Sequence, residues 1–356
     1  MIDKIEELSK SNKEPLEILK YRKESWNRFL QTDMPKDDEW KYTDLSSIDF
    51  NKISFENSIE IKAEGCDVNK LDYNFLAKHL QPGKNKIESF NDALFSSSII
   101  FFIPKNTNAT IDLKMTRQNF AKIFFIVNGN AVVNELTAAS DFTILQTEIF
   151  LSENASLQYN ILDNSEKANI INEKKCHLNA NSNVSFNFAL FGGSVNRLKI
   201  ENFIRENASG KIKGMFFGNS NQHFNISTSA IHLSQSSAND ILIKGALKDY
   251  ATSSYYGAIE ITKEAQKADS YLADHVLLLS EEAKANSIPS LKIDANDVRA
   301  THGATVTELD EEQLFYLMSR GIDHKQSEYL TLNAFFNETM NNNKEIQKLL
   351  EKKMIK

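Results

Sequence analysis

Residues 299–322 read RATHGATVTELDEEQLFYLMSRGI, a strand-like stretch followed by a His-Gly pair and then a helix with strong end signals. Asp310 is a good N-terminal cap, and the two glutamates after it place negative charge at the positive end of the helix dipole. Gly321 can close the other end, where a left-handed backbone conformation is common. The stretch therefore predicts a strand, a turn at the His-Gly pair, and a capped helix.

Upstream of this stretch, from about residue 99, short segments rich in β-branched and aromatic residues alternate with polar turns heavy in Asn and Ser. Eight such segments are expected to be strands: Ile99–Ile103, Lys122–Val127, Thr143–Leu151, Leu157–Leu162, Val184–Leu190, Arg197–Ile204, Lys211–Phe217 and Ile241–Ala246. This texture predicts a mainly β region.

An Asn-Ala dipeptide recurs in that region, and its successive copies begin at 108, 130, 154, 179 and 207. The steps of 22, 24, 25 and 28 residues match the length of one coil of a β-solenoid. Asn tolerates the left-handed backbone of a corner, and a small Ala lets adjacent coils stack closely. Chance recurrence in an Asn-rich chain is the alternative, and an antiparallel sandwich is the competing fold.

The flanking regions are helical in pattern. Residues 3–31 keep near-helical apolar spacing with a break at Pro15, and the segment after Gly321 predicts two further helices. The strand edges at the ends of a solenoid need covers, so we expect the helical regions to be those covers. The predicted division is a mainly helical region over residues 1–98, a β-helix core over 99–308 and a helical domain over 309–356.

Composition restricts the function. The 356 residues are 41% hydrophobic and 25% charged, as in ordinary globular proteins, and the formal net charge of -7 argues against a nucleic-acid partner. The absence of a long apolar run and of a signal peptide favours the cytoplasm, with no membrane contact. No G-x-x-x-x-G-K-[ST] loop occurs, so any ATP hydrolysis must be performed by another subunit.

The chain has two cysteines, Cys66 and Cys176, which are far apart in the sequence. An iron–sulfur cluster held by one chain normally needs four thiolates, which this chain cannot supply. A disulfide is also improbable in a reducing compartment. We expect both cysteines to be structural and no cofactor to be held by this chain alone.

Three stretches resemble one known family. The C-terminal run 299–322, the preceding residues 257–300 and the short segment 39–45 (EWKYTDL) resemble the SufB/SufD family of iron–sulfur cluster assembly scaffolds. Within that family the chain resembles the SufD branch, because Asp274 stands at about the place where the SufB branch carries its essential cysteine.

The resemblance implies a right-handed parallel β-helix between N-terminal and C-terminal helical regions, which decides between the solenoid and the sandwich. It implies a non-catalytic scaffold subunit that forms a heterodimer with a SufB-type subunit and recruits SufC, an ABC-type ATPase. In the family the C-terminal helical domain docks this ATPase, and the candidate residues here are Leu314, Phe315 and Tyr316. A cluster would form transiently with the SufB-type partner. The resemblance also raises a reduced flavin in the assembled complex, which the sequence does not decide.

His302 is the candidate metal ligand, because a neutral imidazole binds iron well. The family's histidine at this position lies near the contact with the SufB-type partner and is implicated in building the nascent cluster. The alternative is a histidine that only hydrogen-bonds its turn. Many relatives carry a cysteine two residues earlier, where this chain has Ala300, so thiolates would have to come from the partner.

Two other functions remain open from the sequence. β-Helices often act on carbohydrate polymers through clustered carboxylates, although no acidic cluster is evident on the expected strands. The chain could also be a structural protein that self-associates as a homodimer through its strand edges.

Overall fold

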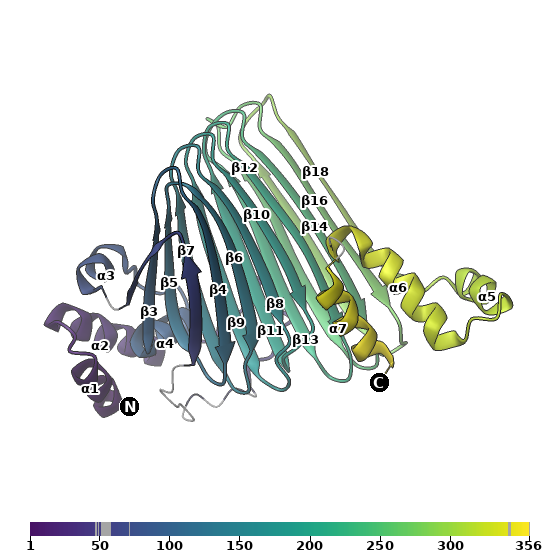
Figure 1. Cartoon of the computed structure of the whole chain (residues 1–356), viewed down its shortest axis with the longest axis horizontal. Helices are drawn as coiled ribbons and strands as arrows, with labels where there is room; N and C mark the ends of the chain where they lie inside the picture. The colour runs from purple at the N-terminus through teal and green to yellow at the C-terminus, as the bar shows by residue number, and fades with distance from the viewer. Residues whose placement is uncertain (47, 49, 51–57, 71, 341–342, 356) are drawn as a thin grey trace.

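The computed structural model describes residues 1–356 except 47, 49, 51–57, 71, 341–342 and 356. Within the described part, the chain forms a long β-solenoid with helices at its two termini (Figure 1). The helices are α1 (Ile2–Ser11), α2 (Leu16–Gln31), α3 (Tyr73–His79), α4 (Lys86–Leu94), α5 (Glu311–Ser319), α6 (His324–Met340) and α7 (Lys344–Ile355).

The solenoid consists of two sheets, each with nine strands among the described residues. Sheet A runs, in order, through β1 (Ile59–Glu64), β4 (Asn108–Thr116), β6 (Asn130–Ala138), β8 (Ser156–Asp163), β10 (Asn183–Leu190), β12 (Ser209–Gly218), β14 (Ala238–Leu247), β16 (Asp269–Leu278) and β18 (Arg299–Glu308). Sheet B runs through β2 (Asp67–Lys70), β3 (Ser97–Ile103), β5 (Phe120–Val127), β7 (Thr143–Leu151), β9 (Asn169–Leu178), β11 (Val195–Ile204), β13 (His223–His232), β15 (Thr252–Ile261) and β17 (Lys284–Ile293). All eight predicted strand segments fall within these strands, and the predicted β-solenoid is confirmed.

Neighbouring coils pair in parallel register, so side chains at paired positions point to the same side of the sheet. One coil is short near the N-terminus, where Asn108 pairs with Asn130, 22 residues later. It is longer near the other end, where Asp269 pairs with Arg299, 30 residues later. The predicted drift in period is therefore a real lengthening of the coils. Asn154, with a φ of 63°, has the left-handed backbone predicted for a corner, whereas the asparagines at 108 and 130 begin strands.

The N-terminal end of the solenoid is closed. β1 pairs antiparallel with β4 and β2 pairs antiparallel with β3, so each sheet ends in a reversed strand. Helix α4 packs beside them, with Phe90 and Leu94 in one buried cluster with Phe120 and Phe142 from the solenoid. The predicted N-terminal cover is confirmed, although the sequence reading did not resolve the two short polar strands.

The segment 39–45 lies across the outer face of sheet B. The Glu39 carboxylate accepts hydrogen bonds from Arg197 Nη2 at 2.8 Å and Lys199 Nζ at 3.0 Å. The Arg197 guanidinium lies 3.8 Å from the centre of the Trp40 ring. Burial opposes the charge on Glu39, but Lys199 and Arg197 together hold the pKa of this carboxyl below its ordinary value. The EWKYTDL motif thus fixes the N-terminal segment to the solenoid.

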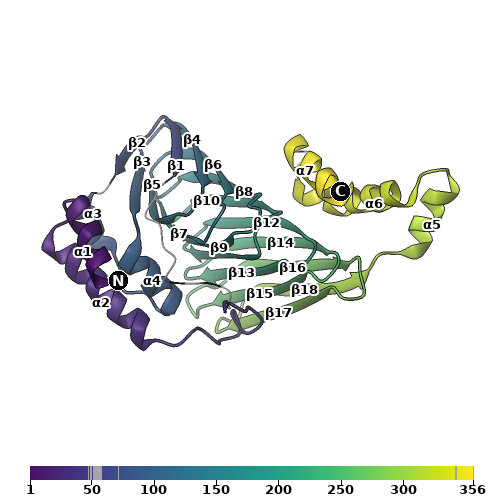
Figure 2. The same ribbon diagram turned by 90° about the horizontal axis from the view of Figure 1, so that it is seen from below.

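The C-terminal helices occupy an unexpected position (Figure 2). Leu332 and Phe336 of α6 pack against Met215, Phe217 and Ala246, which lie on the outer face of sheet A. The expectation that these helices cover the C-terminal end of the solenoid is therefore wrong. The reason is an apolar patch near the ends of β12 and β14, because α6 packs against this patch on the outer face of sheet A.

A charged network is sealed inside the solenoid. The Glu135 carboxylate accepts hydrogen bonds from Lys174 Nζ at 2.7 Å, Asn172 Nδ2 at 2.6 Å and the Tyr159 hydroxyl. Lys174 Nζ also donates to Thr147 Oγ1 at 2.9 Å. Neither charged side chain of the pair is exposed. Because this network spans both sheets, a slip of one strand would break several bonds at once.

Replacing Lys174 with Met leaves the Glu135 carboxylate buried without its countercharge. We expect Lys174→Met to lower the free energy of unfolding by about 3–5 kcal/mol in urea titrations, because breaking a buried pair costs more than the pair contributes. Adding Glu135→Gln should recover part of the loss. A single variant within about 0.5 kcal/mol of the wild type would contradict this role.

Candidate functional site: the open end of the solenoid

The C-terminal end of the solenoid is open. Its last strands are β17, which pairs only with β15, and β18, which pairs only with β16, among the described residues. We call β17 and β18 together the open end. Leu291 and Val306 are in register with Ile259 and Val276, which belong to the interior core, yet they are 39% and 41% exposed. A cross-section of the core therefore meets solvent here.

His302 lies in the middle of β18 and is exposed. It is in register with Leu272, a core residue that is 1% exposed, so the imidazole lies on the interior side of sheet A. The predicted turn at His302-Gly303 is wrong, because both residues continue the parallel ladder of β16. Gly303 lacks a left-handed backbone, and a Cβ there would meet nothing within 4 Å. Ala300 packs against the core from the same strand.

Asp274 lies one coil further in, in register with Ala304 of β18. Its side chain is fully buried, and neither carboxyl oxygen makes a hydrogen bond of good geometry among the described residues. Burial raises its pKa from 3.8 to about 7, although the nearby Ser287 hydroxyl acts to lower it. Tyr255, whose hydroxyl is 2.7 Å from Thr228 Oγ1, is buried in the same end of the core. The place expected to lack a sulfur-accepting thiol thus holds a carboxyl that is easily protonated.

The cysteines lie away from His302 in the fold. Cys176 is buried in the solenoid core, where burial raises the pKa of its thiol, and Cys66 is half-buried near the N-terminal end. Both are free thiols, as expected. The described residues contain no group of three or more His, Cys, Asp or Glu side chains arranged to hold a metal ion.

Helix α5 begins and ends as predicted. The Asp310 carboxylate accepts hydrogen bonds from the backbone N–H groups of Glu312 and Gln313, and Gly321 has a φ of 89°. Of the three candidate docking residues, Leu314 is buried while Phe315 and Tyr316 are 74% and 58% exposed. Figure 1 shows α5 extending away from the solenoid beyond α6.

A groove of about 880 Å³ separates α5 from α6 and the end of β18. Leu309, Tyr316, Leu317, Leu330 and Phe335 supply its apolar lining. The sequence indicated that one part of α5 faces outward, but this groove depends on the position of α6 and could not be foreseen. The structure thus has two separate exposed apolar regions, one at the open end and one at α5.

These features define an open-ended β-solenoid protein with a helical tail. Residues 115–335, well over half of the chain, match the family described as "SUF system FeS cluster assembly, SufBD core domain". The chain belongs to the SufBD family, as the resemblance predicted.

Individual relatives agree. The iron–sulfur cluster assembly protein SufD of Bacillus subtilis (strain 168) is 27% identical over 75% of this chain and 65% of its own length. A SufBD family protein of Synechocystis is 23% identical over 75% of this chain and 61% of its own. A SufBD family protein of Antithamnion is 25% identical over 70% of this chain and 92% of its own. The chain thus spans less than two thirds of the first two relatives, and the match to SufD agrees with the predicted branch.

Among the described residues, no helix has both the length and the apolar character needed to cross a bilayer.

The buried carboxyl of Asp274 predicts a pH-dependent stability. Its pKa is about 7 in the folded chain and 3.8 for an aspartate exposed to water, as in the unfolded chain. The folded state therefore keeps the proton to higher pH. The stability that this proton contributes is complete below pH 3.8 and is lost as the pH rises through about 7. Asp274→Asn cannot titrate. We therefore expect the unfolding free energy of the wild type, relative to Asp274→Asn, to fall by roughly 2–4 kcal/mol between pH 4 and pH 8.

Urea titrations of both proteins across that range provide the measurement. Because every other titrating group is shared by the two proteins, the difference isolates Asp274. If the difference in unfolding free energy between the wild type and Asp274→Asn does not change with pH, Asp274 is ionised in the folded chain.

Proposed function

We propose that this chain is a non-catalytic scaffold subunit of the SUF machinery that pairs through its open end with a SufB-type subunit. The observation that carries the proposal is the pair of unpaired strands at the end of an otherwise closed solenoid. Two further expectations belong to it, a site for iron at His302 and an ATPase docking surface on α5. The whole complex works in the cytoplasm.

The open end favours pairing for two physical reasons. β17 and β18 each present a row of unpaired backbone N–H and C=O groups, which a strand of another chain can satisfy. Beside them, Leu291, Ile293 and Val306 are each about 40% exposed although they continue rows of core residues. A second solenoid placed end to end would extend both sheets and bury these side chains. At the other end the terminal strands β1 and β2 are short and reversed, and α4 packs over the core there.

His302 would then lie at the junction of the two solenoids, on the interior side of sheet A. A neutral imidazole there can bind ferrous iron as the substrate of assembly. Sulfur and the remaining ligands would come from the SufB-type subunit, since this chain has Ala300 and Asp274 in place of thiols near the open end. The cluster is then a product of the joint site rather than a resident cofactor of this chain.

Helix α5 is the proposed docking surface for SufC. Phe315 and Tyr316 are exposed on one turn of a short helix, and the Arg320 guanidinium lies 5.2 Å from the centre of the Tyr316 ring. Exposed aromatic residues beside an arginine are the usual anchors of a protein interface. Helix α6 connects α5 to sheet A through Lys244, which donates to the Phe335 carbonyl at 3.0 Å. Movement of the ATPase could thus reach the solenoid.

The open end and His302 can be tested separately. We expect Val306→Lys to abolish the complex with a SufB-type subunit, because an ammonium would be buried in the joined core, at a cost of several kcal/mol. His302→Ala should pair normally but lose cluster formation in the reconstituted complex. The measurements are mass by light scattering and cluster absorbance after addition of iron and sulfide.

Tyr250→Lys is the matched control, since Tyr250 is 62% exposed in the turn between β14 and β15, outside the open end. Normal pairing of Val306→Lys would refute the open-end interface. Normal cluster yield with His302→Ala would refute the role in iron binding. A stable homodimer of the chain that excludes the SufB-type subunit would instead favour the self-associating alternative.

The docking surface has its own test. We expect the double substitution Phe315→Ala and Tyr316→Ala to weaken binding of the ATPase at least tenfold, because the two side chains supply most of the exposed apolar area of α5. Binding can be followed by calorimetry with purified ATPase. Leu16→Ala, which removes an 82% exposed side chain at the other end of the chain, is the control. Unchanged affinity in the double variant would place the docking surface elsewhere.

A further inference from the structure

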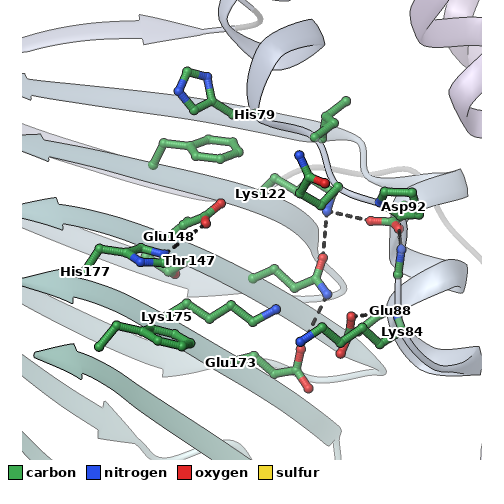
Figure 3. A pocket seen from close by; sticks show the side chains of 17 residues that line it. His79, Lys84, Glu88, Asp92, Lys122, Thr147, Glu148, Glu173, Lys175 and His177 are labelled. Carbon is green, nitrogen blue, oxygen red and sulfur yellow. Dashed lines mark hydrogen bonds and ion pairs between the residues drawn. The ribbon is translucent and has the colours of Figure 1, made fainter. Parts of the chain in front are cut away.

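A cavity far from the open end combines unpaired charges of both signs with aromatic rings (Figure 3). It measures about 260 Å³ and lies between the outer face of sheet B and the segment that joins α3 to α4. Strands β5, β7, β9 and β11 form its floor, and α4 forms one wall. Neither the predicted metal ligand nor the predicted docking residues belong to it, so it needs an explanation of its own.

The parallel register brings the floor residues together. Lys122 of β5, Gln146 of β7 and Glu173 of β9 occupy one row across the sheet. Two residues further along each strand, Glu148 and Lys175 occupy the next row. Because alternate residues of a strand face the same side, all five side chains point outward into the cavity region.

A third row is aromatic. The His177 ring is stacked between Phe150 and Phe203, with ring centres 5.0 Å and 4.9 Å away. Phe124 lies on the floor, and His79 of α3 lies on the opposite side (Figure 3). The cavity thus offers flat apolar surfaces at one side of its charged groups.

Some of the charged groups satisfy one another. Lys122 Nζ is 2.6 Å from Asp92 Oδ1 of α4 and donates to Gln146 Oε1 at 2.8 Å. His177 Nε2 lies 3.3 Å from Glu148 Oε1. These paired side chains form part of the cavity lining, and they have few hydrogen-bonding groups left for a ligand.

Other charged groups in the cavity have no ion pair within the described structure. Glu173 is only 5% exposed, and its hydrogen-bond partner is Gln146 Nε2 at 3.4 Å. Burial, and then the nearby Glu88 carboxylate, raise the pKa of Glu173. Among the described residues, Lys175 makes no contact shorter than 4.0 Å with a carboxylate. Burial lowers the pKa of Lys175, but the more distant carboxylates of Glu88, Glu173 and Glu201 outweigh burial, so that its pKa is raised. The Lys84 ammonium is likewise without an ion pair at the rim.

We propose that this cavity binds a free α-amino acid with an apolar or aromatic side chain. Its ammonium would lie at Glu173, beside Glu88, and its carboxylate at Lys175, while its side chain would lie against Phe124 and the His177 stack. A zwitterion answers both charges at once, whereas a simple anion would leave the buried Glu173 without a partner and a simple cation would leave the half-buried Lys175 without one.

The spacing on the strand fits such a ligand. Glu173 and Lys175 point the same way from positions two residues apart on β9, which places their Cα atoms roughly 6.6 Å apart. The two charges of an α-amino acid are on neighbouring carbon atoms. With one charge-assisted hydrogen bond of about 2.8 Å at each side, one molecule can bridge the pair. The cavity volume suits a small molecule of this kind better than a nucleotide or a peptide.

Three probes that share the same phenyl side chain test the proposal on the intact chain: L-phenylalanine, phenethylamine and 3-phenylpropionate. The last two lack the carboxylate and the ammonium respectively. Binding is measured by calorimetry and by ligand-observed NMR at pH 7. We expect L-phenylalanine to bind at least tenfold more tightly than either analogue, because each charged hydrogen bond lost leaves a buried partner unpaired.

Variants assign the two charges. Glu173→Gln should weaken L-phenylalanine and phenethylamine about tenfold or more while leaving 3-phenylpropionate unchanged. Lys175→Met should weaken L-phenylalanine and 3-phenylpropionate and leave phenethylamine unchanged. Glu264→Gln and Lys263→Met, two exposed positions in the turn after β15, are matched controls that should behave as the wild type.

Three results would overturn the proposal. They are no saturable binding of L-phenylalanine, binding of phenethylamine as tight as that of L-phenylalanine, or wild-type affinity for L-phenylalanine in Glu173→Gln and Lys175→Met. The comparison of the three probes uses the wild-type chain alone and therefore does not depend on the folding of any variant. Pairing and cluster formation at the open end can fail or succeed without changing these outcomes.

Discussion

In-register parallel pairing is the constraint on which the rest of the structure depends. From β3 to β17 and from β4 to β18, each strand repeats the inward and outward alternation of its neighbour. This register sends Leu291, Val306 and His302 to the interior side at the last coil, and it gathers Glu173 and Lys175 on the outer face several coils earlier. A slip of one residue would exchange the two faces and destroy both sites.

The two ends of the solenoid differ in a way that gives the molecule a direction. At the start, each sheet ends in a short reversed strand and α4 packs over the core. At the finish, the edges stay unpaired because the tail helices bind to the side of sheet A instead. The longer coils near the open end also enclose Asp274, a carboxyl without a hydrogen bond of good geometry among the described residues. The two ends of the solenoid therefore differ: α4 covers the core at the N-terminal end, and core positions are exposed to solvent at the C-terminal end.

The sequence predicted the features that depend on local chemistry. The cap at Asp310, the left-handed Gly321 and the eight strand segments follow from residue type and spacing alone, and the family resemblance chose the solenoid over the sandwich. The position of His302 was only partly predictable. The His-Gly pair suggested a turn, whereas pairing with Leu272 and Ala273 of β16 holds both residues in a strand.

What could not be predicted depends on residues distant in the sequence. Leu291 and Val306 look like core residues in the sequence, and only the absence of a next coil exposes them. Glu39 and Arg197 are far apart along the chain, so their ion pair could not be read from either segment. The cavity proposed to bind an amino acid likewise depends on four strands and α4, with no motif of its own. Such features follow from register and packing, which composition does not specify.

Hydrogen exchange of the backbone amides in β17 and β18 tests the central claim most directly. In the free chain, the amides of residues 284–293 and 299–308 that face the unpaired edges should exchange fast, while those of β13 and β14 stay protected. Addition of a SufB-type subunit should protect the edge amides of both strands together. Edge amides that are already protected in the free monomer, or that stay unprotected in the complex, would contradict the account.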